Sequence, residues 1–398
     1  MSADAGVRTG IPALVLDARV VVDRGDFVLD AELRAPHGVT ALLGPNGSGK
    51  TTALLGLAGL VGLTDGHVRL GSQEWAGTGR GRAPERRSVG LVLAEPMLFP
   101  HLTLLDNVAF GPRSRGMPRA RARERAREEL DRVGLADLAG RGPGQVSGGQ
   151  AQRAALARAL ATDPELLLLD EPLSALDPET RSRTRADLAH RLRDYPGVTV
   201  LTTHDPLDAL TLADQLVFLE AGRVTQTGTP GEVVARPRTA YVASLVGLNL
   251  LSGTLVREWR DASVARTMEV SYRAGTGTAT DTGDGGWAVA LAGHQGGAAR
   301  LVLAEPPDGA GEGDRVWATV NPEAVALFTD RPTTSARNLW RLTVEAVTVT
   351  GQRARIHLAG EVPLVAEVTI GAVAALGITT GRELWAGVKA TEVHTYPA

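Results

Sequence analysis

The sequence predicts an α/β domain followed by an all-β region. Residues 1–245 alternate short leucine-rich or β-branched runs with helical patterns, and each run leads into a turn. Such runs are typical of parallel strands buried on both faces. From about residue 247 the pattern changes to Gly- and Thr-rich β segments. A chain of 398 residues, 43% of them hydrophobic, is long enough for two or three domains with cores of their own.

The individual elements follow from local patterns. We expect parallel strands at 39–43, 166–169 and 198–202, and helices at 51–57, 150–161 and 179–195. The Arg-rich stretch 113–132 has glutamates interleaved, which favours a solvated helix. The stretch 274–286 is turn-rich and poorly patterned.

Composition narrows the class of protein. A net charge of −3 with both signs mixed argues against non-specific binding to nucleic acid. The chain has no cysteine, which excludes disulfides and thiolate metal sites. No apolar run reaches the roughly 18 residues that span a bilayer, and Asp17 and Arg19 interrupt the N-terminal apolar stretch. We therefore expect no signal peptide and any membrane contact to go through a partner.

The second region contains an internal repeat. The segment 313–320 matches 381–388 at an offset of 68 residues, and similar openings precede the two copies at 249–255 and 338–344. The repeat predicts two related small β-barrels of the OB type, at 246–330 and 331–398. Chance similarity between two Trp-containing strands is the alternative.

A Gly-rich loop carries the first chemical signal. It follows the expected strand 39–43, opens the expected helix, and contains Lys50, one of only two lysines in a chain that otherwise uses arginine. A lysine ends in a compact charge that enters a tight phosphate cradle. This context predicts a P-loop, in which backbone N–H groups hold phosphates, Lys50 reaches the β- and γ-phosphates, and Thr51 binds Mg²⁺. Its residues are Gly44, Pro45, Asn46, Gly47, Ser48, Gly49, Lys50, Thr51 and Thr52.

Two carboxylates end the strand at 166–169. Asp170 is placed to hold the Mg²⁺ shell, and Glu171 to polarise an attacking water. Two solvated acids at a strand end are the alternative, and the P-loop argues against it. Together, the loop and these carboxylates predict a site that hydrolyses a nucleoside triphosphate.

Further motifs give the chain a family resemblance. Residues 146–150 read Val-Ser-Gly-Gly-Gln and precede a helix. With this segment the chain resembles the ATP-binding subunits of ABC transporters. The resemblance implies an ABC-type α/β P-loop NTPase fold with a helical subdomain at about 98–155, and ATP and Mg²⁺ as cofactors. In that family the signature segment, here Ser147, Gly148, Gly149 and Gln150, contacts ATP held by the opposite subunit. The resemblance also implies a D-loop at 174–177 ending in Asp177, and a γ-phosphate-sensing histidine at His204.

The sequence departs from the family at two places. The glutamine that touches Mg²⁺ and the attacking water in the family corresponds to Ala94, as the Phe-Pro-His sequence at 99–101 indicates. We expect slower but not abolished turnover. The aromatic residue that stacks on adenine is expected at 20–22, where the chain has three valines, and Phe27 is the nearest candidate.

The second β repeat resembles the Mop-type molybdate-binding domain, also called a TOBE domain. Residues 334–338 read Thr-Ser-Ala-Arg-Asn, and Lys389 lies near the closing strand. The resemblance implies an oxyanion pocket formed by Ser335, Arg337 and Lys389, which are donors and cations suited to a tetrahedral dianion. Asn321 takes the lysine position in the first repeat. A β domain that stabilises a dimer and binds no ligand is the alternative.

The expected function is ATP hydrolysis that drives import of molybdate, with tungstate as a second ligand. The resemblance implies a homodimer, integral-membrane permease subunits, an extracytoplasmic oxyanion-binding protein that acts indirectly, no nucleic acid, and a peripheral location on the cytoplasmic face of the membrane. Importers of sulfate, iron(III) or polyamines remain alternatives. So does a slow, nucleotide-gated oxyanion sensor, because of Ala94. A soluble ABC ATPase acting on nucleic acid or ribosomes usually has two cassettes, whereas this chain has one P-loop.

Overall fold

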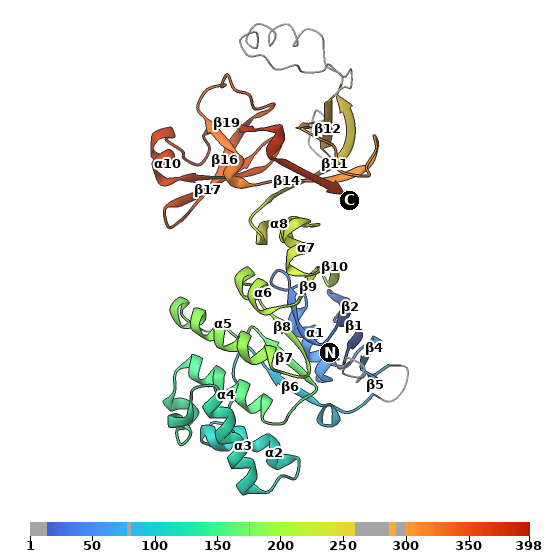
Figure 1. Ribbon diagram of the computed structural model, residues 1–398, viewed down its shortest axis with the longest axis vertical. Helices are drawn as coiled ribbons and strands as arrows, with labels where there is room; N and C mark the ends of the chain where they lie inside the picture. Colours follow the sequence, from blue (N-terminus) through green and yellow to red (C-terminus); the bar gives the residue numbers. More distant parts are fainter. Residues whose placement is uncertain (1–13, 78–80, 175, 259–285, 292–298) are drawn as a thin grey trace, which may run out of the picture. The chain divides into compact units, whose positions relative to one another are not determined.

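The computed structural model describes residues 14–77, 81–174, 176–258, 286–291 and 299–398 (Figure 1). The chain divides into two compact units, Met1–Ala235 and Arg236–Ala398. The first is α/β and the second is almost entirely β, which confirms the predicted order of fold classes. Apart from Gly286, the stretch 274–286 lies outside the described residues. No helix in the described part is long and apolar enough to cross a membrane.

A ten-stranded sheet forms the centre of the first unit. Its order is β5-β4-β1-β2-β10-β9-β3-β8-β7-β6, and the strands from β9 to β6 pair in parallel. The strands are β1 (Leu16–Asp23), β2 (Val28–Ala35), β3 (Gly38–Leu43), β4 (Asp65–Leu70), β5 (Gln73–Ala76), β6 (Val89–Val92), β7 (Leu166–Asp170), β8 (Val198–Thr202), β9 (Gln215–Glu220) and β10 (Arg223–Gly228).

Seven α-helices complete the first unit among the residues that the structure describes. The helix that follows the Gly-rich loop and the helices expected at 150–161 and 179–195 are present. Three helices, α2 to α4, share a small apolar core of their own, which includes Leu104, Val108 and Leu130. The helices are α1 (Lys50–Ala58), α2 (Leu104–Ser114), α3 (Arg119–Arg132), α4 (Gly148–Leu160), α5 (Pro178–Arg193), α6 (Pro206–Leu212) and α7 (Pro230–Ala235), with 3-10 turns η1 (Pro84–Arg86), η2 (Ala136–Leu138) and η3 (Pro143–Gln145).

The parallel strands place the chemical residues at one edge of the sheet. All five residues of β7 and of β8 are buried, as expected for strands covered on both faces. In the register of the sheet, Thr202 pairs with both Leu42 and Asp170. The residues that follow β3, β7 and β8 therefore emerge side by side.

In its described residues the second unit contains two five-stranded antiparallel sheets, in the orders β13-β12-β11-β14-β20 and β15-β19-β16-β17-β18. A single apolar cluster joins residues from both, including Leu255, Val316, Leu342 and Ile356. The elements are α8 (Ala240–Leu245), β11 (Asn249–Glu258), β12 (Gly286–Leu291), β13 (Arg300–Leu303), β14 (Arg315–Val320), η4 (Pro322–Ala324), β15 (Ala326–Phe328), β16 (Asn338–Thr350), β17 (Arg353–Ala359), β18 (Leu364–Thr369), α10 (Ile370–Leu376), β19 (Glu383–Val388), η5 (Ala390–Glu392) and β20 (Val393–Pro397).

The two sequence repeats exchange their last strands. β15 follows β14 in the chain but pairs with β19, and β20 follows β19 but pairs with β14. Each sheet is therefore completed by the other repeat. Two curled sheets with a common core are consistent with the predicted OB-type architecture.

Two buried asparagines repeat this exchange at the level of side chains. Asn249 donates to Val365 O at 2.9 Å and accepts from Val365 N at 2.6 Å. Asn338 donates to Val302 O at 3.0 Å and accepts from Val302 N at 2.7 Å. Each asparagine opens one repeat and satisfies the backbone of a strand in the opposite sheet. Asn338, the last residue of the Thr-Ser-Ala-Arg-Asn segment, is thus committed to structure.

Candidate functional site

The Gly-rich loop has the geometry of a phosphate cradle. Gly44 must be glycine, because a Cβ there would lie 2.0 Å from the carbonyl oxygen of Leu219. Gly47 and Gly49 have φ values of 79° and 104°, a region that favours glycine. Ser48 is buried, and its Oγ has no hydrogen-bond partner within the described residues. An unpaired buried hydroxyl in a loop that excludes side chains fits a phosphate ligand.

Lys50 is the first residue of α1 and lies inside this loop. Its side chain is 7% exposed, and Nζ donates to Gly44 O at 2.8 Å and to Pro45 O at 3.0 Å. Burial lowers the pKa of Lys50, although the charges of Glu171 and Asp170 act in the opposite direction. An ammonium group has three donors, so one remains for an anion.

A pair of oxygen ligands lies next to the loop. Thr51 Oγ1 donates to Asp170 Oδ2 at 3.0 Å, and Thr202 Oγ1 donates to Asp170 Oδ1 at 2.6 Å. The predicted Mg²⁺ ligands are therefore in contact, and a hydroxyl with a carboxylate is the donor set that Mg²⁺ prefers beside phosphates. The sequence reasoning missed Thr202, a buried polar residue that ends an apolar strand.

Glu171 and His204 also lie together. His204 Nδ1 is 3.1 Å from Glu171 Oε2. The backbone N–H of Glu171 donates to Thr202 Oγ1 at 3.0 Å, and Glu171 has a φ of 47°. A glutamate in left-handed backbone is strained, and such strain clusters at functional sites. Thr202 therefore holds Asp170 and Glu171 in a fixed relation.

The signature segment is self-contained. Ser147 N-caps α4 by accepting from Gln150 N at 3.3 Å, and Gln150 Oε1 accepts from Ser147 N at 2.8 Å. Within the described residues, these two side chains hydrogen-bond only in this capping box. Ser147 and Gly148 are exposed. The N-terminus of α4 thus faces outward. In the described part of the chain, the side chains of Ser147 and Gln150 make no hydrogen bond to the phosphate loop that Lys50 binds.

The D-loop segment leads into α5. Asp177 N-caps α5 and accepts from Thr180 N at 3.0 Å, and the bonds from Thr180 lower the pKa of Asp177. Arg181 of α5 contacts Asp205 at 3.0 Å, beside His204. Ala175 lies outside the described residues.

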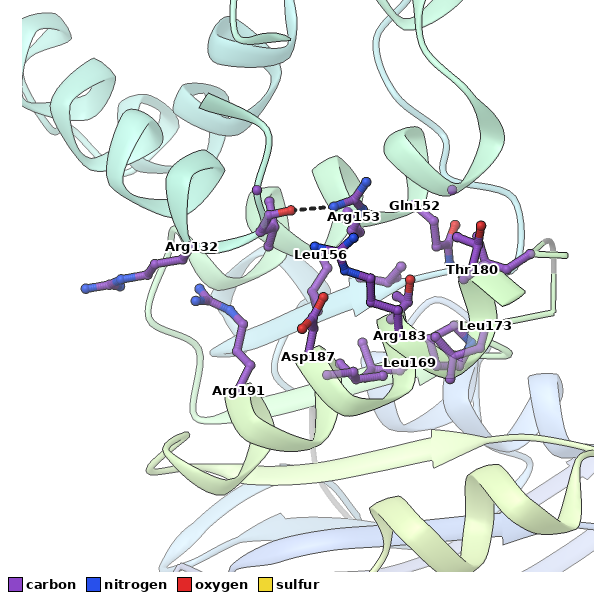
Figure 2. Close-up of a pocket in the computed structure, with 18 of the residues that line it drawn as sticks. Arg132, Gln152, Arg153, Leu156, Leu169, Leu173, Thr180, Arg183, Asp187 and Arg191 are labelled. Atoms are coloured by element: carbon purple, nitrogen blue, oxygen red, sulfur yellow. Dashed lines mark hydrogen bonds between the residues drawn. The ribbon is translucent and has the colours of Figure 1, made fainter. Parts of the chain in front are cut away.

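A cleft of about 880 Å³ separates α4 from α5 (Figure 2). Gln152 and Arg153 line it from α4, and Thr180, Arg183 and Asp187 from α5. Gln152 is 5% exposed, and its Oε1 has no partner among the described residues. The signature helix is therefore not packed tightly against α5 along this face.

The two departures from the family pattern occupy distinct places. Ala94 is exposed, in the bend that follows β6. The ring of Phe27 packs next to Gly49, where an added Cβ would lie 3.1 Å from Cζ of Phe27. Val20 and Val22 are buried in the core. Phe27 is thus at the phosphate loop, whereas two of the valines at 20–22 are not available to a ligand.

The three predicted oxyanion residues do not line one pocket together. Lys389 lines a pocket of about 390 Å³, whereas Ser335 and Arg337 are exposed and are not among its lining residues. In this segment the residues that line the pocket are Thr334 and Ala336, the two neighbours of Ser335. The lining is Asn321, Glu323, Ala324, Ala326, Phe328, Thr334, Ala336, Gly387, Lys389 and Glu392.

Comparison with known proteins gives two family matches. Residues 31–174 match the ABC transporter family, and residues 334–395 match the TOBE domain. The second match covers the segment with Ser335 and Arg337 and also Lys389. The two matches fall in the α/β unit and the β unit respectively.

Relatives extend the comparison over almost the whole chain. The molybdenum import ATP-binding protein ModC of Mycobacterium tuberculosis is 38% identical over 96% of this chain and 97% of its own length. The sulfate/thiosulfate import ATP-binding protein CysA of Mycolicibacterium paratuberculosis is 44% identical over 70% of this chain and 77% of its own. A solved dimeric ATP-binding cassette with ADP and Pi is 28% identical, with a TM-score of 0.48, over 55% of this chain and 99% of that chain. The chain therefore belongs to the ABC transporter family, as an ATP-binding protein with a C-terminal TOBE domain.

Proposed function

We propose that the chain is the ATP-hydrolysing subunit of a molybdate importer that also accepts tungstate. One observation carries the ATPase part: Thr51, Asp170, Thr202, Glu171 and His204 form one connected set of polar contacts beside the buried ammonium of Lys50. A phosphoryl-transfer site needs a cradle, a metal position and a group that orients water. This set supplies all three.

The mechanism follows from these contacts. Lys50 and the N–H groups of the phosphate loop bind the phosphates, and Thr51 and Asp170 would hold Mg²⁺, which neutralises phosphate charge when bound. Glu171 orients the attacking water and accepts its proton. His204, within hydrogen-bond distance of Glu171, keeps that carboxylate oriented and senses the terminal phosphate.

We propose that two copies complete each other's sites. The outward-facing N-terminus of α4, with Ser147, Gly148, Gly149 and Gln150, would cover ATP bound to the partner copy, and Asp177 would line the same seam. A helix N-terminus with free N–H groups is suited to an anion. Integral-membrane permease subunits would dock near Ala94, which places the chain at the cytoplasmic face of the membrane. An extracytoplasmic oxyanion-binding protein would act indirectly, and no role for nucleic acid is proposed.

Similarity over nearly the full length favours molybdate as the substrate. The molybdenum relative covers both units of this chain, whereas the sulfate relative matches less of it with higher identity. Sulfate is therefore the second candidate. The proposed nucleotide site binds ATP and not the transported anion, so its geometry does not distinguish molybdate from sulfate.

We also propose that the TOBE region senses the oxyanion through Lys389. Lys389 follows β19 and lines a pocket with Thr334, and Ser335 and Arg337 lie on the adjoining segment. One of the pocket's two carboxylates, Glu323, is paired with Arg353. That pairing reduces the repulsion that a bound dianion would meet.

Calorimetric titration of the full chain with molybdate, tungstate and sulfate tests the sensing. We expect heat with molybdate and tungstate and none with sulfate. Heat with sulfate alone would favour the second candidate, and no heat with any of the three would contradict sensing. Steady phosphate release from the same preparation distinguishes an ATPase from a nucleotide-gated sensor without turnover.

A further inference from the structure

The loop that carries Ala94 is held by side chains of other elements. This loop, residues 93–103, joins β6 to α2, and its first half is held by side chains of α4, the signature helix. Arg158 donates to Met97 O at 2.7 Å and to Pro96 O at 3.0 Å, and Gln152 donates to Leu93 O at 3.4 Å. Both donors belong to the helix whose N-terminus is the signature segment.

Arg158 is well suited to this task. Its guanidinium lies 5.5 Å from the centre of the Phe99 ring, in cation–π contact, and burial lowers its pKa. A guanidinium offers several donors in a rigid fork, so it can hold two neighbouring carbonyls at once. Within the described residues, Arg158 has no carboxylate partner. Its charge is therefore directed at the loop.

The far end of the loop is fixed in the same way. Asn107 of α2 is fully buried and donates to Phe99 O, Leu102 O and Thr103 O, and it accepts from Phe99 N at 2.7 Å. The helices α2, α3 and α4 share one apolar core. Backbone from residue 96 to 103 is therefore attached to the helical subdomain.

The start of the loop is much freer. The side chains of Ala94 and Glu95 are exposed and make no hydrogen bond or ion pair among the described residues. The cleft between α4 and α5 leaves room beside the signature helix, along the face that carries Gln152 and Arg153 (Figure 2). A rotation of α4 would thus carry residues 96–103 along and bend the chain at Ala94.

We propose that Arg158, assisted by Gln152, is the positioning residue that couples the signature helix to the 93–103 loop, so that the loop follows α4 when ATP is bound. The link uses backbone carbonyls and does not need a glutamine at position 94. This inference deepens the proposed function, since the loop is where the permease is proposed to dock. ATP hydrolysis itself does not pass through Arg158.

Distance measurements between spin labels test the coupling in the full chain. Because the chain has no cysteine, two can be introduced at chosen sites in a Glu171→Gln background. Labels at Met97→Cys and Arg127→Cys report the distance between the loop and the helical subdomain. Labels at Met97→Cys and Ser182→Cys report the distance between the loop and α5. We expect a narrow 97–127 distribution that ATP leaves unchanged, and a 97–182 distance that ATP shifts.

Replacing Arg158 should release the loop. In Arg158→Met the 97–127 distribution broadens and ATP no longer shifts the 97–182 distance, whereas Arg158→Lys, which keeps the charge but loses the fork, is intermediate. Arg153→Met is the matched control, because Arg153 is on the same helix but donates to Val133 O within the helical subdomain. A distribution as narrow in Arg158→Met as in the parent would overturn the proposal.

A kinetic cycle gives an independent readout. If Ala94→Gln raises kcat, we expect that gain to fall by a factor of about three or more when Arg158→Met is also present. Such non-additivity is typical of residues in one network. Arg158→Met alone should keep kcat and KM within about twofold, because the native loop contributes no catalytic side chain. An equal gain in kcat with and without Arg158 contradicts the coupling.

The failure of the proposed function can be told apart from the failure of the coupling. If ATP causes neither dimerisation nor a change in the 97–182 distance in the parent, the proposed function fails. The width of the 97–127 distance distribution in Arg158→Met then still tests whether Arg158 holds the loop.

Discussion

The two lysines of the chain lie in opposite surroundings. Lys50 is buried, holds two carbonyls of its own loop and has a pKa lowered by burial. Lys389 is exposed and shares its pocket with Glu323 and Glu392. The candidate nucleotide site is therefore held together by its own hydrogen bonds, whereas the TOBE pocket offers one cation among mixed charges. Preorganisation of this kind favours tight, rigid recognition at Lys50 and weaker recognition at Lys389.

The repeat sharpens this comparison. Asn321 and Lys389 occupy equivalent positions after β14 and β19, and both line the same pocket. Asn321 N-caps η4 by accepting from Glu323 N at 3.0 Å, whereas the Lys389 side chain makes no capping bond to η5. Asparagine is a favoured N-cap and lysine is not. With lysine at this position, η5 lacks the N-cap hydrogen bond that Asn321 gives to η4. The loss of that bond supports a ligand-binding role for Lys389.

The largest effect is expected at the nucleotide site. Glu171→Gln should lower ATP hydrolysis by about 100-fold or more, because the amide cannot accept the proton of water. ATP binding should persist through Lys50 and Thr51, and ATP should trap a dimer that size-exclusion chromatography detects. Glu179→Gln, an exposed change in the first turn of α5, is the control. A Glu171→Gln protein that stays monomeric with ATP would contradict the paired-site mechanism.

Lys50→Arg tests whether the buried lysine is needed as a lysine. The wide guanidinium does not fit between Gly44 O and Pro45 O, so ATP affinity should fall by about 10- to 100-fold, as for a lost hydrogen bond to a charged group. Binding of a fluorescent ATP analogue measures it. Retained affinity would show that the cradle is less rigid than its geometry indicates.

Lys389→Arg is the matching change in the exposed pocket. We expect oxyanion affinity to fall by about three- to tenfold, because an open site accommodates arginine better than a closed one. Titration of the full chain with molybdate measures the change. Unchanged affinity would make the second lysine an accident of composition.

Ala94→Gln should have the smallest effect and the opposite sign. A glutamine there could reach Mg²⁺ and the attacking water, so kcat for ATP should rise about threefold, within the range for a positioned polar group. Phosphate release under saturating ATP measures it. No change in rate would mean that the Ala94 position does not limit turnover.

The candidate nucleotide site could be proposed from the sequence because its parts are local motifs. The loop at 44–52 and the pair Asp170–Glu171 are each contiguous, and a strand–turn–helix context is visible along the chain. Thr202 was missed because its role arises from register: β8 lies between β3 and β7, which brings the Thr202 hydroxyl to the carboxylate of Asp170 and to the backbone N–H of Glu171. No short window of sequence contains that information.

In the β region, several features depend on contacts between residues that are distant in the sequence. By itself the sequence determined the order of domains, the repeat and the chemistry of the phosphate loop, because these depend on local composition and spacing. Only the tertiary structure decided that β15 and β20 change places, that Asn338 is used by the backbone of Val302, and that Arg158 holds the Ala94 loop. Each depends on which distant backbone groups need a partner, and buried N–H and C=O groups find one only once the chain has folded.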